Sequence, residues 1–512
     1  MYLNAVNRVA GLVSGLETQK IVEDLVKVAR LPLDRLLQQK QVLEWRREDY
    51  RSINISLTNF RTSTASPLRL QGTFLVKKAT SSDESAVTAT PDGSAQPGTY
   101  SIKISQLAEV ATDISSTALS AVGQKIDPNA TLESQKSKFV NPWSGTALEF
   151  KITTYNPDGT PNSKTFAVDT TVDSLNSVIA RINAETSLGV TAFYEPSTDK
   201  VVISTKKTGN YATNEIEIED VTGTFALGTL ALAATAQGKN AILDINGLTG
   251  IQQYENTFTL NKITFTIKKT TTSPVLVTVS NDTDHIFNTV KNFVDQFNSL
   301  LDTIKKELTE ERYPDYLPLT EEQKEQLTDK QIEQWEEKAK SGLLRNDPIL
   351  SDIVYRLRRA LTAPVTGLTG YDSLFDIGIR TGYYWEGGKL YIDEAALREA
   401  INANPEAVMN LFTKNAAAFD SQGLGVRLYD EVSKAINRIN AQAGSAAALY
   451  DNSFLSRSIR DLDERIDITE ERLKELEDRY WRQFAALEQA LAAMQAQSDW
   501  LAGIASQTSS MR

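Results

Sequence analysis

Residues 473–503 read LKELEDRYWRQFAALEQALAAMQAQSDWLAG, and this stretch decides how the rest of the chain must be arranged. Its apolar side chains recur three or four positions apart, which is the spacing of one face of an α-helix. Burial of each large apolar side chain contributes about 1.5 to 3 kcal/mol, so a helix of this length is very costly to leave in water. We therefore expect it to pack against other helices.

The apolar stripe begins before this stretch and continues through most of it. Together with the adjacent Trp481, its members are Leu455, Ile459, Leu462, Ile466, Leu473, Leu476, Tyr480, Trp481, Phe484, Leu487, Leu491 and Met494. Two successive steps of four residues, from Leu476 to Tyr480 and on to Phe484, insert an eleven-residue period into the heptad repeat of the stripe. Such a period locally relaxes a left-handed supercoil. Because one face cannot bury three aromatic side chains so close together, we expect Phe484 to stay in the core and Trp481 to project away.

A second stripe lies near the start of the chain and is a natural partner for the first. It includes Leu36, Leu43, Tyr50, Leu57 and Phe60. Pro32 removes one backbone donor from this segment, so we expect a bend there or two helices that meet near Leu31. A third helix is predicted between Ile286 and Leu308. These three segments would bring residues 1–75 and 430–512 into one helical bundle.

Between the helical ends the apolar period changes to two, which indicates half-buried strands. Tyr100, Ile102 and Ile104 alternate with polar residues in this way. Asp158 and Gly159 are typical of a hairpin turn, and residues 175–183 predict a short helix with one apolar face.

The patterns together predict a multidomain α+β protein, with helices from both chain ends and β-rich domains between them, one inserted in another. The expected segments are a helical 1–75, a β-rich domain of 76–114 with 240–282, an inserted β-rich domain of 115–239, helices and a hairpin over 283–429, and coiled-coil helices over 430–512. Local signals mark some boundaries within them. Thr320 with Gln323, and Thr328 with Gln331, have the spacing of a capping box, and Asn404 before Pro405 predicts a helix start.

Composition excludes several classes of function. The chain has 54 Lys and Arg against 66 Asp and Glu, a net charge of −12, so nucleic acid is not an expected partner. It has no Cys and one His, which excludes disulfides and thiolate chemistry and leaves few routes to a metal site. No segment is long and apolar enough for a transmembrane helix, and no cleaved signal peptide is predicted.

Motifs for catalysis are absent from the sequence. Glycine-rich stretches lack the order required for a nucleophile elbow, a dinucleotide loop or a P-loop. Asp461, Asp463 and Asp467 fall on a predicted helix and lack the glycine of a calcium loop. We therefore expect no catalytic, cofactor-binding or metal-binding residues and no enzymatic activity, although a carboxylate pair that acts as a glycoside hydrolase has no sequence signature and stays open.

Several stretches together resemble the bacterial flagellar filament cap family, also called hook-associated protein 2. They are SGLETQKIVEDLVKVARLPLDRLLQQKQVLE near the start, PGTYSIKISQLA, KSGLLRNDPIL, SLFDIGIRT, GGKLYID, and WRQFAALEQALAAMQAQSDWLAG near the end. The resemblance covers nearly the whole chain in the same order. Residues 149–209 are in addition similar to an insertion module that recurs in flagellins.

The resemblance implies a non-enzymatic role at the distal tip of the flagellum. A protein of this family retains exported flagellin and promotes its folding and insertion, with helical legs from both chain ends and β-rich domains that form a plate. The implied partners are flagellin and other axial proteins, further copies of the chain in a ring, and an export chaperone. The implied location is extracellular, after export by the flagellar apparatus without a cleaved signal peptide.

A second class of function stays open beside the first. The inserted β-rich domain faces outward in the family, so an adhesin that binds glycans is an alternative, with Tyr155, Phe166, Phe193 and Tyr194 as candidate aromatic contacts. Residues 1–13 and 506–512 are polar or weakly periodic, so we expect them to be mobile in the isolated protein. On the family reading, Trp481 would contact a neighbouring leg or an axial subunit.

Overall fold

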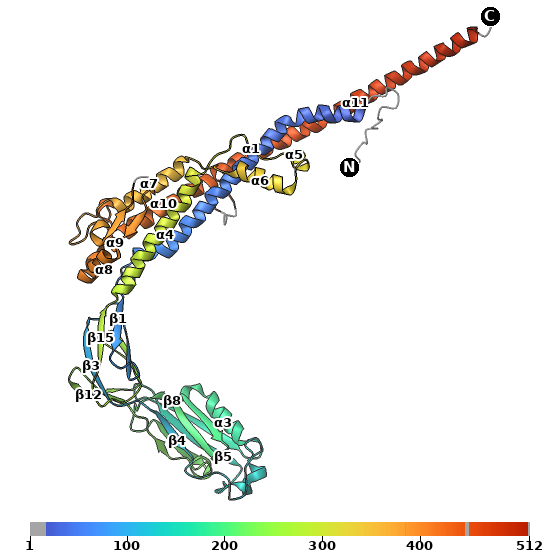
Figure 1. The fold of residues 1–512 in the computed structure, drawn as a ribbon. Coiled ribbons are helices and arrows are strands. Elements are labelled where there is room, and N and C mark those ends of the chain that lie inside the picture. Colours follow the sequence, from blue (N-terminus) through green and yellow to red (C-terminus); the bar gives the residue numbers. More distant parts are fainter. Residues whose placement is uncertain (1–16, 384–385, 446–449, 510–512) are drawn as a thin grey trace. The chain divides into compact units, whose positions relative to one another are not determined.

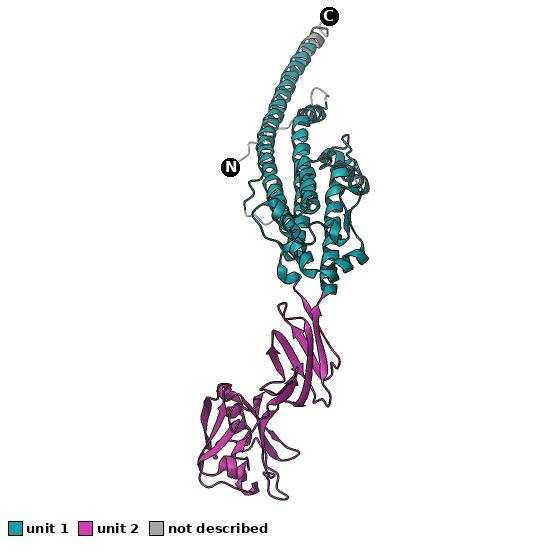
Figure 2. Ribbon diagram, turned by 90° about the vertical axis from the view of Figure 1, so that its left-hand side faces the viewer, with its two compact units in different colours: residues 1–74, 283–512 teal, residues 75–282 magenta. Residues whose placement is uncertain are grey.

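The computed structural model describes residues 17–383, 386–445 and 450–509, and it divides the chain into two compact units. One unit comprises residues 1–74 and 283–512, and the other comprises residues 75–282 (Figures 1 and 2). The first is mainly helical and the second is built from antiparallel sheets. The predicted α+β class, with helices from both chain ends and β-rich domains between them, is confirmed.

The helical unit contains helices and one short hairpin. Its elements are α1 Thr18–Phe60, η1 Arg61–Ala65, α2 Ser66–Leu68, η2 Gln71–Thr73, α4 Thr283–Thr309, α5 Glu321–Glu325, α6 Asp329–Lys340, α7 Pro348–Thr362, η6 Phe375–Ile377, β16 Ile379–Thr381, β17 Leu390–Ile392, α8 Glu394–Ala403, α9 Pro405–Thr413, η8 Phe419–Ser421, α10 Leu424–Ala443 and α11 Phe454–Ser509. Its core contains the apolar faces of α4, α7, α9 and α10, which are buried against one another and against the C-terminal half of α1.

The first helix passes through Pro32 without ending, so the alternative of two separate helices near Leu31 is wrong. Proline removes one backbone hydrogen bond, but the helix is held on both sides of it by buried side chains, Val22 and Leu33. Residues 1–13, which we expected to be mobile, lie outside the described residues. At the other end α11 is helical as far as Ser509.

The short-range signals of the sequence are confirmed. Both predicted capping boxes are present, at Thr320 and at Thr328, and the Asn404 side chain accepts from Ala407 N at the start of α9. The hairpin that contains Asn261 and Lys262 places both turn residues at positive φ, 50° and 64°. That is the backbone of a tight two-residue hairpin turn.

The β unit contains several sheets and one α-helix. Its elements are β1 Lys77–Ser81, β2 Val87–Pro91, β3 Gly98–Gln106, β4 Val110–Ile114, η3 Glu133–Lys138, β5 Ala147–Tyr155, β6 Pro161–Asp169, α3 Leu175–Ala184, η4 Thr186–Leu188, β7 Val190–Glu195, β8 Lys200–Thr208, β9 Ile216–Thr222, η5 Phe225–Thr229, β10 Thr235–Ala236, β11 Ala241–Ile245, β12 Leu248–Gln253, β13 Thr257–Leu260, β14 Ile263–Ile267 and β15 Val275–Asn281.

These strands enclose two separate cores. The sheets β1-β15-β3-β11-β12 and β13-β14-β2 share a core formed by residues 86–108 and 241–279. The sheets β10-β9-β5-β6 and β4-β8-β7 share a second core with α3, formed by residues 111–236. The second core is therefore an inserted domain, and the chain enters it and leaves it side by side. Glu109 N donates to Lys239 O at 2.9 Å, and Lys239 N donates to Glu109 O at 3.1 Å.

Two predictions within the inserted domain are confirmed. The turn at Asp158 and Gly159 joins β5 to β6, which pair along their whole length. Helix α3 buries Leu175, Val178, Ile179 and Ile182 on one face.

Candidate assembly surface

Helices α1 and α11 lie antiparallel along much of their length (Figure 1). Polar pairs fix their register. Lys40 Nζ lies 2.6 Å from an Asp463 carboxylate oxygen on α11, and Arg51 Nη2 lies 2.7 Å from Oδ2 of Asp451, just before α11 begins. The hydrogen bond to Asp463 raises the pKa of Lys40. Counting outward from the Lys40–Asp463 pair, the first residue of α1, Thr18, comes opposite about residue 485 of α11.

Burial along the predicted stripes follows this register. The structure buries Tyr50, Leu57, Phe60, Leu455, Ile459, Leu462, Ile466 and Trp481, half-buries Leu36, Leu43, Leu473, Leu476, Tyr480, Phe484 and Leu491, and exposes Leu487 and Met494. The helix pair therefore forms a continuous contact near the core of the unit. The contact becomes less complete toward the free end of α11.

The assignment of the two aromatic residues near the four-residue steps is wrong. Trp481 is only 8% exposed, whereas Phe484 is half-buried. Trp481 and the first turns of α1, including Val22, line the same open hollow of about 520 Å³. The indole Nε1 donates to Glu477 Oε1 at 3.2 Å. Trp481 is thus turned toward α1, and Phe484 is less covered because it lies near the point where the described part of α1 begins.

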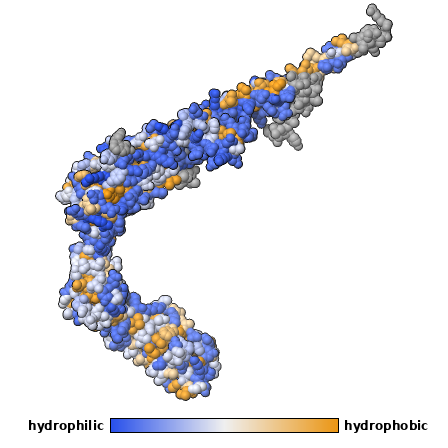
Figure 3. Space-filling model, in the orientation of Figure 1, coloured by the Kyte–Doolittle hydropathy of each residue, from blue (hydrophilic) through white to orange (hydrophobic). Residues whose placement is uncertain are grey.

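Beyond this point α11 carries an exposed apolar surface. Leu487, Met494, Trp500 and Leu501 are 44%, 58%, 65% and 57% exposed. Apolar residues are visible along this end of the helix in Figure 3. We call this surface the α11 tip, and it is a candidate contact with other protein chains because exposed apolar side chains gathered on one segment typically mark an interaction site.

A buried carboxylate, which sequence reasoning missed, ties α1 to α7. Asp347 is 3% exposed and accepts hydrogen bonds from Tyr50 Oη at 2.5 Å and from Arg46 Nη2 at 3.0 Å. Its other oxygen accepts from the backbone N–H groups of Ile349 and Leu350 at the start of α7. Burial and the bond to Asp347 raise the pKa of Tyr50. The signal available in the sequence was Asp347 before Pro348, which is typical of a helix start.

A second missed residue is Arg427 on α10, whose side chain is fully buried. Its guanidinium donates to four backbone carbonyl oxygens, at Ala363, Pro364, Phe419 and Asp420, over 2.6 to 2.9 Å. Desolvation lowers the pKa of Arg427. The guanidinium therefore holds two loops on α10 by hydrogen bonds that a shorter or apolar side chain cannot make.

A half-buried acidic cluster lies between α1 and α4. Asp49 faces Glu307 and Glu310, and burial, followed by repulsion from these two carboxylates, raises its pKa from 3.8 to about 7. Burial also raises the pKa of Glu307. Neutral pH therefore lies near the pKa of Asp49. Among the described residues no group of three His, Cys, Asp or Glu side chains is arranged to hold a metal ion.

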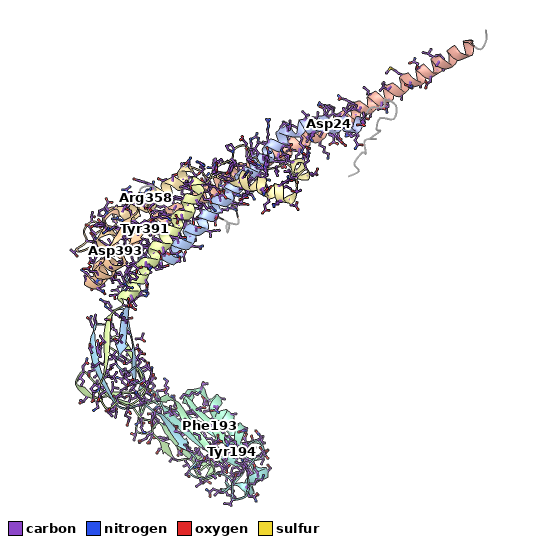
Figure 4. The ribbon with its side chains drawn as sticks, viewed as in Figure 1. Asp24, Phe193, Tyr194, Arg358, Tyr391 and Asp393 are labelled. Atoms are coloured by element: carbon purple, nitrogen blue, oxygen red, sulfur yellow. The ribbon has the colours of Figure 1, made fainter. Side chains whose placement is uncertain are left out.

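One sheet face of the inserted domain also carries exposed apolar residues. Ile114, Val202 and Phe193 lie opposite one another across β4, β8 and β7, and Ile114 and Phe193 are 50% and 48% exposed. Figure 4 marks Phe193 and its neighbour Tyr194 on this domain. Tyr194 Oη donates to Asp199 at 2.6 Å. Of the aromatic contacts considered for a glycan, Phe166 is buried in the core, stacked on Phe150.

Comparison with known proteins assigns the family. The family model for the flagellar hook-associated protein 2 C-terminus matches residues 238–496, and the model for the N-terminus of the same proteins matches residues 14–111. The chain belongs to the flagellar hook-associated protein 2 family. The two matches together include the α1–α11 pair except for the end of the α11 tip.

Individual relatives extend the match to nearly the full chain. A flagellar hook-associated protein 2 from Halalkalibacterium halodurans is 34% identical, over 96% of this chain and 98% of its own length. One from Thermotoga maritima is 31% identical over 64% of this chain and 52% of its own length. The crystal structure of the D1-D2-D3 domains of the flagellar cap protein FliD from Escherichia coli shares the fold, with a TM-score of 0.56 and 20% identity over 81% of this chain and 99% of its own.

Within the described residues, no helix of this hook-associated protein 2 family member is long and apolar enough to cross a membrane.

Proposed function

We propose that this chain caps the growing end of a flagellar filament, where it retains exported flagellin and promotes its folding and insertion. The 34% identity to a flagellar hook-associated protein 2 over 96% of this chain is the observation that carries the proposal. The proposed role is structural and involves no catalytic step. It places the protein outside the cell at the distal filament tip, after passage through the flagellar export apparatus without a cleaved signal peptide.

The α11 tip is the surface that would contact axial subunits. It combines four exposed apolar side chains with a helix whose other end is fixed in the core of the unit. Burial of the exposed parts of Leu487, Met494, Trp500 and Leu501 would contribute about 3 to 7 kcal/mol before the cost of association. Recognition of an export chaperone before assembly is a further part of the proposal, because an exposed apolar helix in the cell requires protection.

A test uses cells that lack their filament cap protein and release flagellin into the medium. The wild-type chain is expected to restore filament growth. Leu487→Asp combined with Met494→Asp is expected to leave flagellin in the medium, because two carboxylates on the α11 tip prevent its burial. Gln489→Asp combined with Gln495→Asp is the matched control, since both glutamines are exposed on the same helix and the charge change is the same.

The control pair separates loss of the apolar contact from added charge. Filament growth with the Leu487 and Met494 variant at the wild-type rate would exclude the α11 tip as the contact. Loss of growth with the control variant would indicate that charge alone disturbs assembly. A wild-type chain that fails to restore growth would contradict the capping function itself in that cell.

A second candidate function is glycan binding by the inserted domain. It is favoured by the apolar row of Ile114, Val202 and Phe193, in which Ile114 and Phe193 are exposed and Val202 is half-buried. A parallel row of hydroxyl side chains lies beside it, and Thr112 Oγ1 is 3.1 Å from Ser204 Oγ. Sugar rings present both apolar faces and hydroxyl groups, which such a surface could contact. Loss of glycan-array binding on Phe193→Ser, with binding retained by Phe375→Ser in the helical unit, would support it. The absence of any wild-type signal would exclude it.

A further inference from the structure

The exposed face of α6 carries unpaired acidic side chains. Asp329, Glu333 and Glu337 are spaced four residues apart, so they follow one face of this helix, and Lys330 lies beside them. All four are exposed, and none of the three carboxylates forms an ion pair within the described part of the chain. The opposite face of α6 packs inward through Ala339 and Trp335, whose Nε1 donates to Leu317 O. We call the exposed residues the α6 acidic row.

A cationic groove lies on a different part of the same unit, between α7 and α10. Two adjoining hollows of about 240 and 220 Å³ share Arg356 and Glu431 in their walls. The groove contains four cationic and two acidic side chains, which are Arg356, Arg359, Lys434, Arg438, Asp352 and Glu431. Its excess of two positive charges stands out in a chain whose net charge is −12.

The two carboxylates of the groove arrange its cations. Asp352 lies between Arg356, at 2.8 Å, and Arg438. Glu431 lies between Lys434, at 2.7 Å, and Arg356, at 4.0 Å. The Arg356 and Lys434 side chains are nevertheless 53% and 64% exposed. Arg356 and Lys434 therefore keep donors exposed for a partner while the carboxylates hold them in position, which lowers the entropy lost on binding.

We infer that the α6 acidic row of one copy of this chain docks in the α7–α10 groove of a second copy. The row carries three negative charges and one positive charge, and the groove carries four positive and two negative, so their net charges are equal and opposite. In Figure 1, α6 and the α7–α10 pair lie on different parts of the helical unit. A contact between two different patches is heterologous, and repetition of it closes into a ring when the rotation between copies allows.

This inference rests on the proposed function, because a ring of copies at the filament tip is what the contact would build. A contact between identical patches would stop at a dimer, whereas a contact between the acidic row and the groove leaves one of each free on every pair. Both patches are exposed charges, so the contact is expected to weaken as salt is added.

Charge reversal in the full chain, followed by sedimentation velocity, tests the contact. Glu333→Lys with Glu337→Lys reverses the net charge of the row, and Arg359→Glu with Lys434→Glu reverses that of the groove. Either pair alone places like charges opposite each other, and we expect the concentration for half-association to rise at least about tenfold at 100 mM salt. All four substitutions in one chain restore the complementarity, and we expect association to return to within about threefold of wild type.

The matched control is Glu399→Lys with Glu406→Lys. These two exposed carboxylates lie on α8 and α9 of the same unit, outside both patches, and their reversal changes the net charge of the chain by the same amount as reversal of the acidic row. Association of this variant is expected to equal that of wild type. Thermal unfolding of every variant shows that reduced association does not come from misfolding.

Three results would overturn the inference. A wild-type chain that stays monomeric would exclude both the contact and the ring. Normal association of either reversed pair, with the wild-type chain assembling, would exclude this contact and leave the capping function standing. Normal association of the reversed pairs together with loss of filament capping would show that the groove takes a filament subunit instead of a second copy.

Discussion

Replacement of Asp49 by asparagine is expected to stabilise the helical unit at neutral and alkaline pH. Asp49 is half-buried between α1 and α4 and faces Glu307 and Glu310, which raise its pKa to about 7 after the larger effect of burial. The fold therefore favours the protonated, neutral form of this carboxyl. Asparagine has nearly the same shape and stays neutral at every pH, so it removes the penalty for the ionised form.

The pH dependence follows from the direction of the shift. A carboxyl whose pKa is raised in the folded state contributes stability below its unfolded pKa of 3.8, and this contribution is lost as pH rises to about 7. The full shift corresponds to about 4 kcal/mol at 1.36 kcal/mol per pKa unit. Asp49 keeps part of its surface in water, so screening reduces the expected gain from Asp49→Asn to about 1 to 2 kcal/mol at pH 8. The gain should fall toward zero near pH 4.

Urea unfolding of the full chain at pH 4.5 and pH 8, followed by circular dichroism at 222 nm, measures this difference. Glu464→Gln is the control, because it removes one carboxylate from an exposed position on α11 and should change the free energy of unfolding by less than about 0.5 kcal/mol. An equal gain at both pH values would refute the argument, since it would not come from titration. A loss of stability at pH 8 would show that the Asp49 carboxylate makes a favourable contact.

The other predictions also concern the helical unit and use unfolding free energies. Tyr50→Phe should cost about 1 to 3 kcal/mol, because Asp347 loses one donor inside the protein; no loss would mean that water replaces the hydroxyl. Arg427→Met should lower the free energy of unfolding by at least about 2 kcal/mol, because the carbonyls of Ala363 and Pro364 lose their donor while those of Phe419 and Asp420 keep backbone donors. A neutral effect would show that the burial penalty of the guanidinium cancels these bonds. Trp481→Ala should lower the free energy of unfolding by about 3 kcal/mol and Phe484→Ala by about 1 kcal/mol, because Trp481 is the more buried of the two. The reverse order would contradict this assignment.

Local structure was predictable because its determinants are neighbours in the sequence. A capping box needs only Thr328 and Gln331, three positions apart, and the hairpin turn between β5 and β6 needs only Asp158 and Gly159. The alternating strands and the α3 face follow from the same short-range rules. Each element could therefore be placed without knowledge of what it packs against, and the α+β class followed from their order.

The environment of Trp481 was not predictable because it depends on register between distant segments. Its burial requires the start of α1 to lie opposite, and that position is fixed by pairs such as Lys40 with Asp463, more than 400 residues apart. The steps of four residues around Tyr480 indicated that the three aromatics could not all face one way. They did not indicate which one faces α1.

The buried charged residues were also missed, for a related reason. Arg427 lies on a helix where an arginine normally reaches solvent, and nothing near it in sequence indicates the carbonyls of Ala363 and Pro364. Asp49 stands in a polar run with Glu48, and only the packing of α4 distinguishes the carboxyl that is half-buried from the one that is exposed. Such residues acquire their properties from tertiary contacts.

The two backbone hydrogen bonds between Glu109 and Lys239 have a consequence for how proteins of this architecture can diversify. Residues paired in this way have Cα atoms about 5.5 Å apart, so the inserted domain is joined covalently to the carrier domain at two adjacent points. Any module whose own ends lie equally close could replace residues 110–238 as a cassette while the carrier sheets keep their register. Changes within residues 110–238, including replacement of the whole domain, would then leave the fold of the carrier domain intact. Sequence variation on the surface of the protein would therefore be concentrated in the inserted domain.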